Sequence, residues 1–252
     1  MSNKRQNALY QERTYRYKTS GHDLIEQTII QNESDLQIYS NVNVVDKADG
    51  HLREIRDLLN AHIEKHPNFE KSLEPITFEQ TPKDLHPQVL KMYHAARRAG
   101  VGPMAAVAGA VSEYIGQRLF SENESLTDIF IENGGDIYLK TTKERRILVH
   151  AGQSPLSEKL AIKIKPEMTP CGICTSSGTV GHSLSFGKAD AVVVISKDTC
   201  LADATATSLG NLIQEDTDIE RGIAVARQIE GIDGVLFIVG DKLGAWGQVE
   251  LC

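Results

Sequence analysis

The sequence predicts an α+β protein with mixed, mainly antiparallel sheets and packed helices. Apolar runs of strand length are grouped near the start of the chain and again in its second half. Amphipathic stretches of helical period separate these groups, and strands do not alternate with helices as they do in parallel βαβ folds. At 252 residues and 40% hydrophobic content the chain can bury a sizeable core. We therefore expect one domain over residues 1–252, with an N-terminal half of about 1–125 and a C-terminal half of about 126–252.

The N-terminal third predicts strands followed by one long helix. Strands are expected within residues 11–20, 22–31 and 35–43, where apolar and polar residues alternate. Residues 46–65 have Leu52, Ile55 and Leu59 on one helical stripe, and Pro67 ends the helix. The histidines of the helical regions lack ligand-like spacing and are expected at the surface; they are His51, His62, His66, His86 and His94.

The middle of the chain predicts two more helices. A short strand is expected at 76–79, then a helix at 88–99 that ends at Gly100, a residue typical of helix C-caps. The next helix begins at Pro103 and continues to Leu119. Because it is rich in alanine and glycine, we expect it to pack tightly against a sheet or another helix.

The second half predicts mostly strands. The run Ala191–Ile195 is typical of a buried strand, whereas Cys171–Gly187, rich in Gly, Ser and Thr, is expected to form a loop. The remaining expected elements are strands at 128–132, 137–140, 146–150, 161–164, 189–196 and 234–239, helices at 201–213 and 218–229, a turn at 241–247 and an edge strand at 248–251.

Composition limits the classes of function. A net charge of −7 and a pI near 5.6 argue against nucleic-acid binding, which needs clustered Lys and Arg. No apolar run approaches the ~18 residues of a membrane span, and the N-terminus lacks the apolar region of a secretory signal. We expect a cytoplasmic protein with no membrane partner and four free thiols. Edge strands and the alanine-rich helix offer surfaces for a homo-oligomer.

The first motif that could bind a ligand is Asn133-Gly134-Gly135-Asp136. Two glycines let a backbone approach a ligand closely, and the flanking Asn133 and Asp136 supply polar contacts. The alternative is a hairpin turn, because Asn-Gly and Gly-Asp pairs are common in such turns.

The second motif is the start of the helix after residue 201. Asp203 and Thr207 are four residues apart, so a carboxylate and a hydroxyl project from one helical face. Two such oxygens, completed by carbonyls and water, suit Mg²⁺. The alternative is a carboxylate that only stabilises the helix N-terminus.

The third motif is Cys171-x-x-Cys174 followed by Thr175-Ser176-Ser177-Gly178. The cysteines could be a redox pair, half of a zinc site completed by Cys200 and Cys252, or small apolar residues of the core. The Gly/Ser/Thr run suits a phosphate-like anion, although it lacks the Gly-Lys-Ser/Thr ending of a P-loop. His182 could act as a base or be an ordinary loop histidine.

Taken together, these motifs resemble the ApbE-like superfamily, which includes the FAD:protein FMN transferases. The resemblance rests on the order of a Gly-Gly-Asp strand, a Thr-Ser-Ser-Gly loop, a valine-rich strand and Ala-Asp-Ala-x-Ala-Thr at a helix start. It covers roughly residue 100 to the C-terminus. It is closest to a less characterised branch found in methanogens and other anaerobes.

The resemblance implies a T-fold-like architecture with internal pseudo-duplication and a site for FAD, or another nucleotide, and Mg²⁺. Asp203 and Thr207 would be metal ligands, and Gly134, Gly135 and Asp136 would line the ligand pocket. The loop formed by Thr175, Ser176, Ser177 and Gly178 would lie beside this pocket. The chain lacks the Asp-Pro-x-Thr-Gly segment of the transferases, and His182 could replace the histidine that precedes it.

The branch resemblance suggests an accessory role in anaerobic sulfur assimilation, through persulfide handling and homocysteine biosynthesis. Cys174 or Cys171 would carry the sulfur, because a thiolate in a Gly-rich loop would have a lowered pKa and the second cysteine could resolve a persulfide. A small-molecule ligand and a sulfur-relay protein would be its partners. The alternatives are a Mg²⁺-dependent FAD:protein FMN transferase or FAD hydrolase, and a non-catalytic binding or assembly module.

Overall fold

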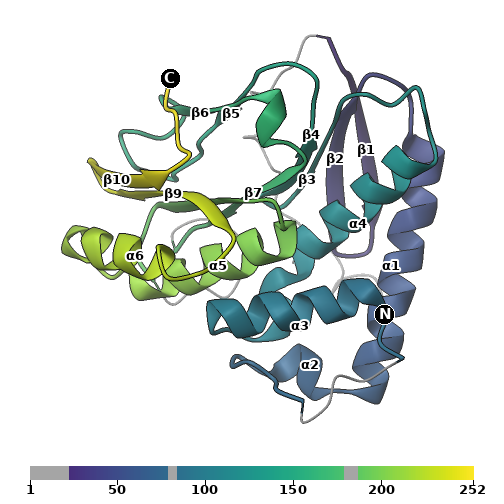
Figure 1. Cartoon of the computed structure of the whole chain (residues 1–252), viewed down its shortest axis with the longest axis horizontal. Coiled ribbons are helices and arrows are strands. Elements are labelled where there is room, and N and C mark those ends of the chain that lie inside the picture. The colour runs from purple at the N-terminus through teal and green to yellow at the C-terminus, as the bar shows by residue number, and fades with distance from the viewer. Residues whose placement is uncertain (1–22, 79–83, 179–186) are drawn as a thin grey trace, which may run out of the picture.

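A computed structural model describes residues 23–78, 84–178 and 187–252. Its main feature is an eight-stranded sheet of order β1-β2-β3-β4-β7-β8-β9-β10, in which all neighbours are antiparallel, and a second sheet pairs β5 with β6 (Figure 1). The predicted α+β class with mainly antiparallel sheets is confirmed. The strands are β1 Ile25–Gln31, β2 Ser34–Ser40, β3 Ile129–Asn133, β4 Asp136–Lys140, β5 Arg145–Leu148, β6 Ala161–Ile164, β7 Cys171–Ser176, β8 Ala191–Ser196, β9 Ile232–Val239 and β10 Lys242–Gly247.

The helices interrupt the strands at two places. In the described chain, two strands, a helical segment and two strands follow one another twice: β1-β2, α1 to α4, β3-β4, and then β7-β8, α5 and α6, β9-β10. This repeated order is what an internal duplication would produce. The helices are α1 Val45–Lys65, α2 Asn68–Lys71, α3 Pro87–Ala99, α4 Val107–Ser121, α5 Thr199–Leu212 and α6 Ile219–Ala226, with 3-10 turns at Pro103–Ala106, Pro166–Met168 and Asp216–Asp218.

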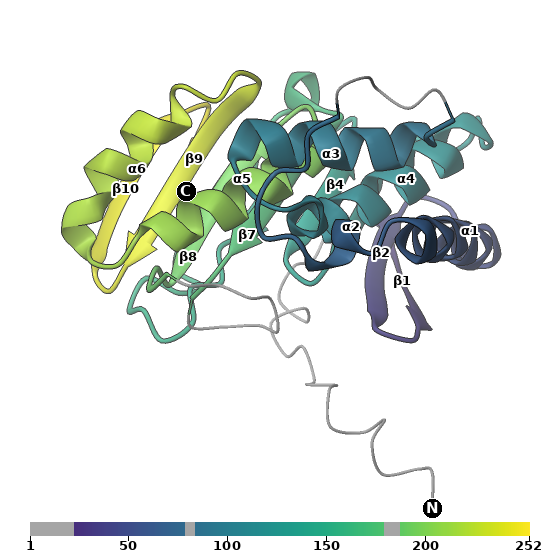
Figure 2. The same ribbon diagram turned by 90° about the horizontal axis from the view of Figure 1, so that it is seen from below.

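The large sheet separates two apolar cores. The helices cover one face, where Ile131, Tyr138 and Val194 of the sheet meet residues of all the longer helices (Figure 2). The small sheet covers the other face, where Ile137 and Ile173 meet residues of β5 and β6 (Figure 1). Because side chains alternate along a strand, the six inner strands of the large sheet, β2, β3, β4, β7, β8 and β9, contribute to both cores.

Five local predictions are wrong. Residues 171–176 form the strand β7 rather than a loop, because their small side chains fit between β4 and β8 at the centre of the sheet. Residues 242–247 form β10 instead of a turn, and residues 248–251 contribute a single bridge, Leu251 to Ile162. The described part of 76–79 is not a strand. His62 is buried, not exposed, and its ring lies 2.9 Å from the Tyr93 hydroxyl.

Within the described parts of the chain, no helix combines the length and apolar character that crossing a membrane requires.

Candidate functional site

Helix α5 lies against the centre of the large sheet and carries one side of the site. Asp198 begins the helix as its N-cap, with its Oδ1 accepting a hydrogen bond from the Leu201 N–H at 3.2 Å. Small residues let the helix approach β7 closely: a Cβ added to Gly172 would lie 2.6 Å from the Cα of Thr199. The carboxylate of Asp203 is thereby held inside the molecule.

Asp203 completes the start of another helix, α4. Its Oδ2 accepts a hydrogen bond from the Gly109 N–H at 2.8 Å, and Ala108 supplies a second backbone donor. The first N–H groups of a helix have no partner within the helix. The residue before α4, Ala106, cannot cap it with a side chain, so Asp203 does this from α5.

Asp136 reaches the same interior space from β4. It stands opposite Cys174 in the register of β4 and β7, on the face that the helices cover. Its backbone carbonyl accepts a hydrogen bond from the Ser112 hydroxyl at 3.1 Å. Its Oδ1 is buried without a hydrogen-bond partner among the described residues. A buried carboxylate oxygen left in this state favours binding of a proton or a cation.

The pKa shifts of Asp136 and Asp203 also favour binding of a proton or a cation. Burial raises the pKa of Asp203 to about 7, against the hydrogen bonds from Gly109 and Ala108, which lower it. Burial, followed by the charge of Asp203, raises the pKa of Asp136 well above its ordinary value. The two groups therefore cannot both ionise easily unless a positive charge lies between them.

The Gly-Gly turn lies at the edge of this centre. Gly134 and Gly135 have φ values of +69° and +105°, which L side chains rarely adopt, and they connect β3 to β4. The Gly135 N–H donates to Glu132 Oε1 at 2.8 Å, and the Asn133 amide donates to the Ala108 carbonyl at 3.3 Å. The sequence allowed a hairpin turn or a ligand loop here, and this segment is a hairpin turn that also fixes Asp136 near Asp203.

Only part of the expected loop Thr175-Ser176-Ser177-Gly178, at the end of β7, lies on the side of the sheet that faces the site. Ser176 faces the helices, and a Cβ added to Gly210 would lie 2.8 Å from its hydroxyl. Thr175 stands opposite Val193 and faces the other core, so its side chain lies on the side of the sheet away from Asp203. Ser177 and Gly178 follow the strand, and the Gly178 N–H donates to the Ala189 carbonyl at 2.9 Å. His182 lies outside the described residues.

Thr207 lies one turn beyond Asp203 on the same side of α5 and is half-buried. Asp203 and Thr207 together with the Asp136 Oδ1 thus offer oxygen atoms suited to a hard cation such as Mg²⁺. The sequence predicted Asp203 and Thr207 as metal ligands and Asp136 as a residue of the ligand pocket. It did not predict the contribution of α4, whose only sequence signal was glycine at position 109 within an alanine-rich helix.

The two cysteines of the C-x-x-C motif do not form a pair. Cys171 belongs to the core beneath the small sheet and Cys174 to the core beneath the helices, because residues three apart on a strand face opposite sides. Burial raises the pKa of the Cys171 thiol to about 12, and burial and Asp136 raise that of Cys174 well above its ordinary value. The expected lowering of the thiol pKa is therefore wrong, and neither cysteine can resolve a persulfide on the other in this fold. All four cysteines are free thiols.

Comparison with known proteins places the chain in a family. A family model described as "AbpE bacteria" matches residues 18–231. The UPF0280 protein of Methanococcus aeolicus is 42% identical over 202 residues, which are 79% of this chain and 79% of that protein. The UPF0280 protein of Methanocaldococcus jannaschii is 36% identical over 227 residues, covering 84% of this chain and 89% of that protein. The expected resemblance to a methanogen branch is confirmed.

Solved structures confirm the ApbE-like fold. The ApbE protein of Thermotoga maritima matches with a TM-score of 0.58 and 14% identity, covering 88% of this chain and 96% of that one. The flavin transferase ApbE of Vibrio cholerae matches with a TM-score of 0.50 and 16% identity, again over 88% of this chain and 96% of that one.

Proposed function

The chain belongs to the AbpE bacteria family, and from that premise we propose that its Asp136–Asp203 centre binds a flavin dinucleotide through Mg²⁺ and promotes cleavage of its diphosphate. Cleavage would pass the FMN part to water, as in an FAD hydrolase, or to a protein hydroxyl, as in an FMN transferase. The name of the Vibrio cholerae structure, a flavin transferase, is consistent with this choice of ligand.

The observation that carries the proposal is the buried, unpartnered Oδ1 of Asp136 next to a second buried carboxyl group, Asp203. Both groups are 8% exposed or less, and burial raises the pKa of each. A structural role alone would be served by one carboxylate that caps α4. Asp136 receives hydrogen bonds from the Cys174 thiol and the Thr175 backbone, but its Oδ1 has no partner among the described residues and fits a site that binds a cation.

Asp203, Thr207 and the Asp136 Oδ1 would hold the metal ion. When bound, Mg²⁺ would neutralise diphosphate oxygens and polarise the bond to be broken. The Gly109 N–H holds the Asp203 Oδ2, and Asp203 would contribute a carboxylate oxygen to the cation. Gly134 and Gly135 carry no side chains beside Asp136, and the Ser176 hydroxyl, on the helix-covered face of the sheet, would be a further oxygen near the ligand.

The proposal is tested by titrating FAD with and without Mg²⁺ and by separating FMN and AMP chromatographically after incubation. We expect binding that requires Mg²⁺ and release of FMN. Asp203→Ala should weaken Mg²⁺-dependent binding by roughly a hundredfold, the upper range for changes around bound metal ions. Asp57→Asn, on the exposed side of α1, serves as the matched control and should behave as wild type. Equal flavin binding by Asp203→Ala, or no flavin binding by the wild type, would overturn the proposal.

The sulfur-handling role stays a separate prediction. It would use Cys174 or Cys171 for persulfide transfer in homocysteine biosynthesis, with a sulfur-relay protein as partner. The geometry favours the carboxylate centre over it, since both thiols are buried with raised pKa values. Loading with a persulfide donor and mapping the modified cysteines by mass spectrometry distinguishes the two roles. Flavin binding that persists in a doubly mutated Cys171→Ser, Cys174→Ser protein would separate the flavin site from the thiols.

A further inference from the structure

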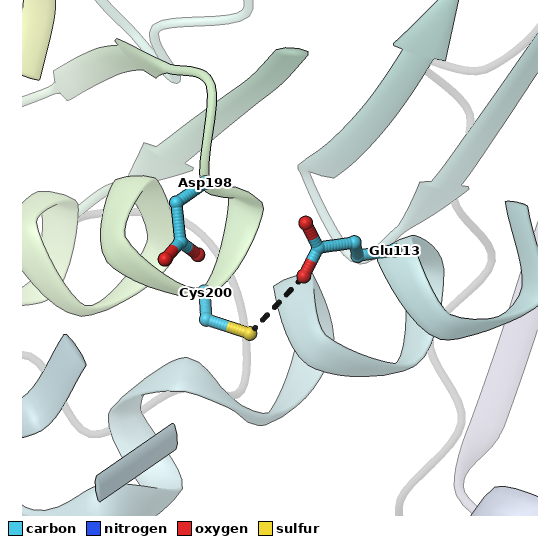
Figure 3. A group of neighbouring side chains, drawn as sticks. All are labelled: Glu113, Asp198 and Cys200. Carbon is cyan, nitrogen blue, oxygen red and sulfur yellow. Dashed lines mark hydrogen bonds between the residues drawn. The ribbon is translucent and has the colours of Figure 1, made fainter. Parts of the chain in front are cut away.

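A second polar centre lies where α3, α4 and α5 meet, about one turn along α5 from Asp203. It consists of Glu113 on α4 and of Asp198 and Cys200 at the start of α5 (Figure 3). One ligand atom of each residue lies within 4.8 Å of those of the other two. Within residues 23–78, 84–178 and 187–252 this is the one group of three His, Cys, Asp or Glu side chains whose ligand atoms lie so close together.

The fold fixes these atoms in position. Glu113 is 2% exposed and Cys200 is fully buried, and the Cys200 Sγ lies 3.6 Å from Glu113 Oε2. Asp198 cannot turn away freely, because its Oδ1 is the N-cap acceptor of α5. Gln88 of α3 closes the centre with its amide, 3.3 Å from the Cys200 Sγ and 3.4 Å from Glu113 Oε2. The donor atoms therefore come from two helices and converge without rearrangement of the backbone.

The centre has more negative than positive groups around it. Glu113 and Asp198 supply two carboxylates, whereas Lys91 supplies one ammonium, 3.0 Å from Glu113 Oε2. The Lys91 side chain is 39% exposed and can move into solvent without opening the core. Burial, together with Glu113 and Asp198, raises the pKa of the Cys200 thiol, so the thiol keeps its proton while no metal is bound.

We propose that Glu113, Asp198 and Cys200 form a binding site for a borderline-soft divalent metal ion of the zinc type. One thiolate and two carboxylates are a ligand set that Zn²⁺ accepts in tetrahedral geometry, with a water in the fourth position. The sulfur ligand favours Zn²⁺ or Co²⁺ over Mg²⁺. On binding, the S–H bond of Cys200 breaks, a bond from sulfur to the metal forms, and the proton leaves to solvent while Lys91 moves off Glu113. The site shares no residue with the flavin site, and the proposal does not rest on flavin binding.

The experiment titrates the metal-free protein with Zn²⁺ and with Co²⁺ by calorimetry and absorption. We expect one ion per chain at this centre, release of about one proton per ion in buffers of different protonation enthalpy, and a sulfur-to-cobalt charge-transfer band. Cys200→Ser should abolish the band and weaken Zn²⁺ binding by at least about tenfold, and Glu113→Gln should weaken binding similarly while keeping the band. Mg²⁺ at the same concentration should not compete.

Two matched controls show where the metal binds. Cys171→Ser removes a buried thiol from the other core, and Asp203→Asn removes the carboxylate of the flavin site; both should bind Zn²⁺ as wild type does. Circular dichroism checks that each variant is folded. If Cys200→Ser does not fold, Glu113→Gln still tests whether Zn²⁺ binds at this centre. Absence of Zn²⁺ and Co²⁺ binding, or a Co²⁺ band that survives Cys200→Ser, would overturn the proposal.

Discussion

Asp203 serves two roles that place opposite demands on its charge. Its Oδ2 accepts the Gly109 N–H at the start of α4, which favours the ionised form, but burial favours the neutral form and raises its pKa to about 7. The neighbouring Asp136 carboxyl group adds to the cost of ionising both. The protein without a cation is therefore less stable at neutral pH than a chain with one uncharged group at this position.

Asp203→Asn tests this cost of ionisation. Because the folded-state pKa lies above the ordinary 3.8, the stabilising contribution is fully present below pH 3.8 and is lost as pH rises through about 7. Asparagine keeps an oxygen for the Gly109 N–H and carries no charge. In EDTA at pH 8 we expect the variant to melt at least about 3 °C above wild type, with the gap closing towards pH 4. Thermal scans at several pH values provide the measurement, and a lower melting temperature of the variant at pH 8 would contradict it.

Burial also determines which thiols can react. Cys171, Cys174 and Cys200 are buried, whereas Cys252 is exposed. A thiol reagent added to the native protein at pH 8 should therefore modify Cys252 rapidly, and the other three only as the chain unfolds. Peptide mapping after a short pulse of alkylation measures this. Rapid modification of Cys174 in the native protein would instead support the sulfur-handling role.

At the level of elements, the site depends on how closely α5 lies on β7. A Cβ on Gly172 would lie 2.6 Å from the backbone Cα of Thr199, an atom that moves only if the helix does. Gly172→Ala should therefore destabilise the fold by about 1 to 3 kcal/mol and weaken flavin binding, because α5 carries Asp203. Urea unfolding and FAD titration measure the two effects.

Gly50→Ala is the matched control for that substitution. Gly50 lies on the exposed side of α1, in its second turn, with no atom within 4 Å of an added Cβ. Alanine there should stabilise the protein by roughly 0.5 to 1 kcal/mol through helix propensity. A similar effect of both substitutions would mean that α5 and β7 are not in close contact.

Elements with strong periodicity could be predicted from the sequence. The helix expected at 46–65 is α1, Val45–Lys65, and the valine-rich run is β8. By contrast, β7 was missed because its Cys, Gly, Thr and Ser residues show no apolar periodicity. They form a strand because they pair with β4 on one side and β8 on the other. Strand formation that depends on pairing with distant strands cannot be predicted from the local sequence.

Site residues, too, could be predicted only where the local sequence distinguishes them. Asp136 and Asp203 could be selected because they stand in short motifs next to glycine and alanine. Glu113 could not, because within a helix its charge looks like that of any solvated residue. Its burial depends on Cys200, Gln88 and Lys91, which approach from other helices.

Over the whole molecule, Asp128 joins the two sheets. Its carboxylate accepts hydrogen bonds from the Thr141 hydroxyl at 2.6 Å and the Thr142 hydroxyl at 2.8 Å, just after β4, and from Arg145 of β5 at 3.2 Å. Burial would raise the pKa of Asp128, but the hydrogen bonds outweigh it and hold the pKa well below the usual range. The connection between the sheets thus depends on an ionised carboxylate.

Asp128→Asn should destabilise the protein by about 2 to 4 kcal/mol at pH 7, because it leaves Arg145 and several donors without a carboxylate. The folded-state pKa is depressed, so the contribution of Asp128 is present above 3.8 and is lost as pH falls through the lower folded-state value. Urea unfolding should show the full difference at pH 7 and a reduced but still measurable one at pH 3, because pH 3 lies below the unfolded pKa and above the folded one. Arg53→Gln, from an exposed pair with Asp49, should change stability by less than about 1 kcal/mol.

The residues on either side of 179–186 are held by backbone hydrogen bonds to the described part of the chain. The Gly178 N–H donates to the Ala189 carbonyl at 2.9 Å, and the Lys188 N–H donates to the Ile213 carbonyl at 2.8 Å. The ends of this connection are therefore fixed by neighbouring strands and by the end of α5. Doubling the length of a loop between fixed ends costs only about 0.6 kcal/mol in the general case. A change in the number of residues between Gly178 and Lys188 should thus leave both anchoring hydrogen bonds, and with them the position of α5 and its Asp203, intact.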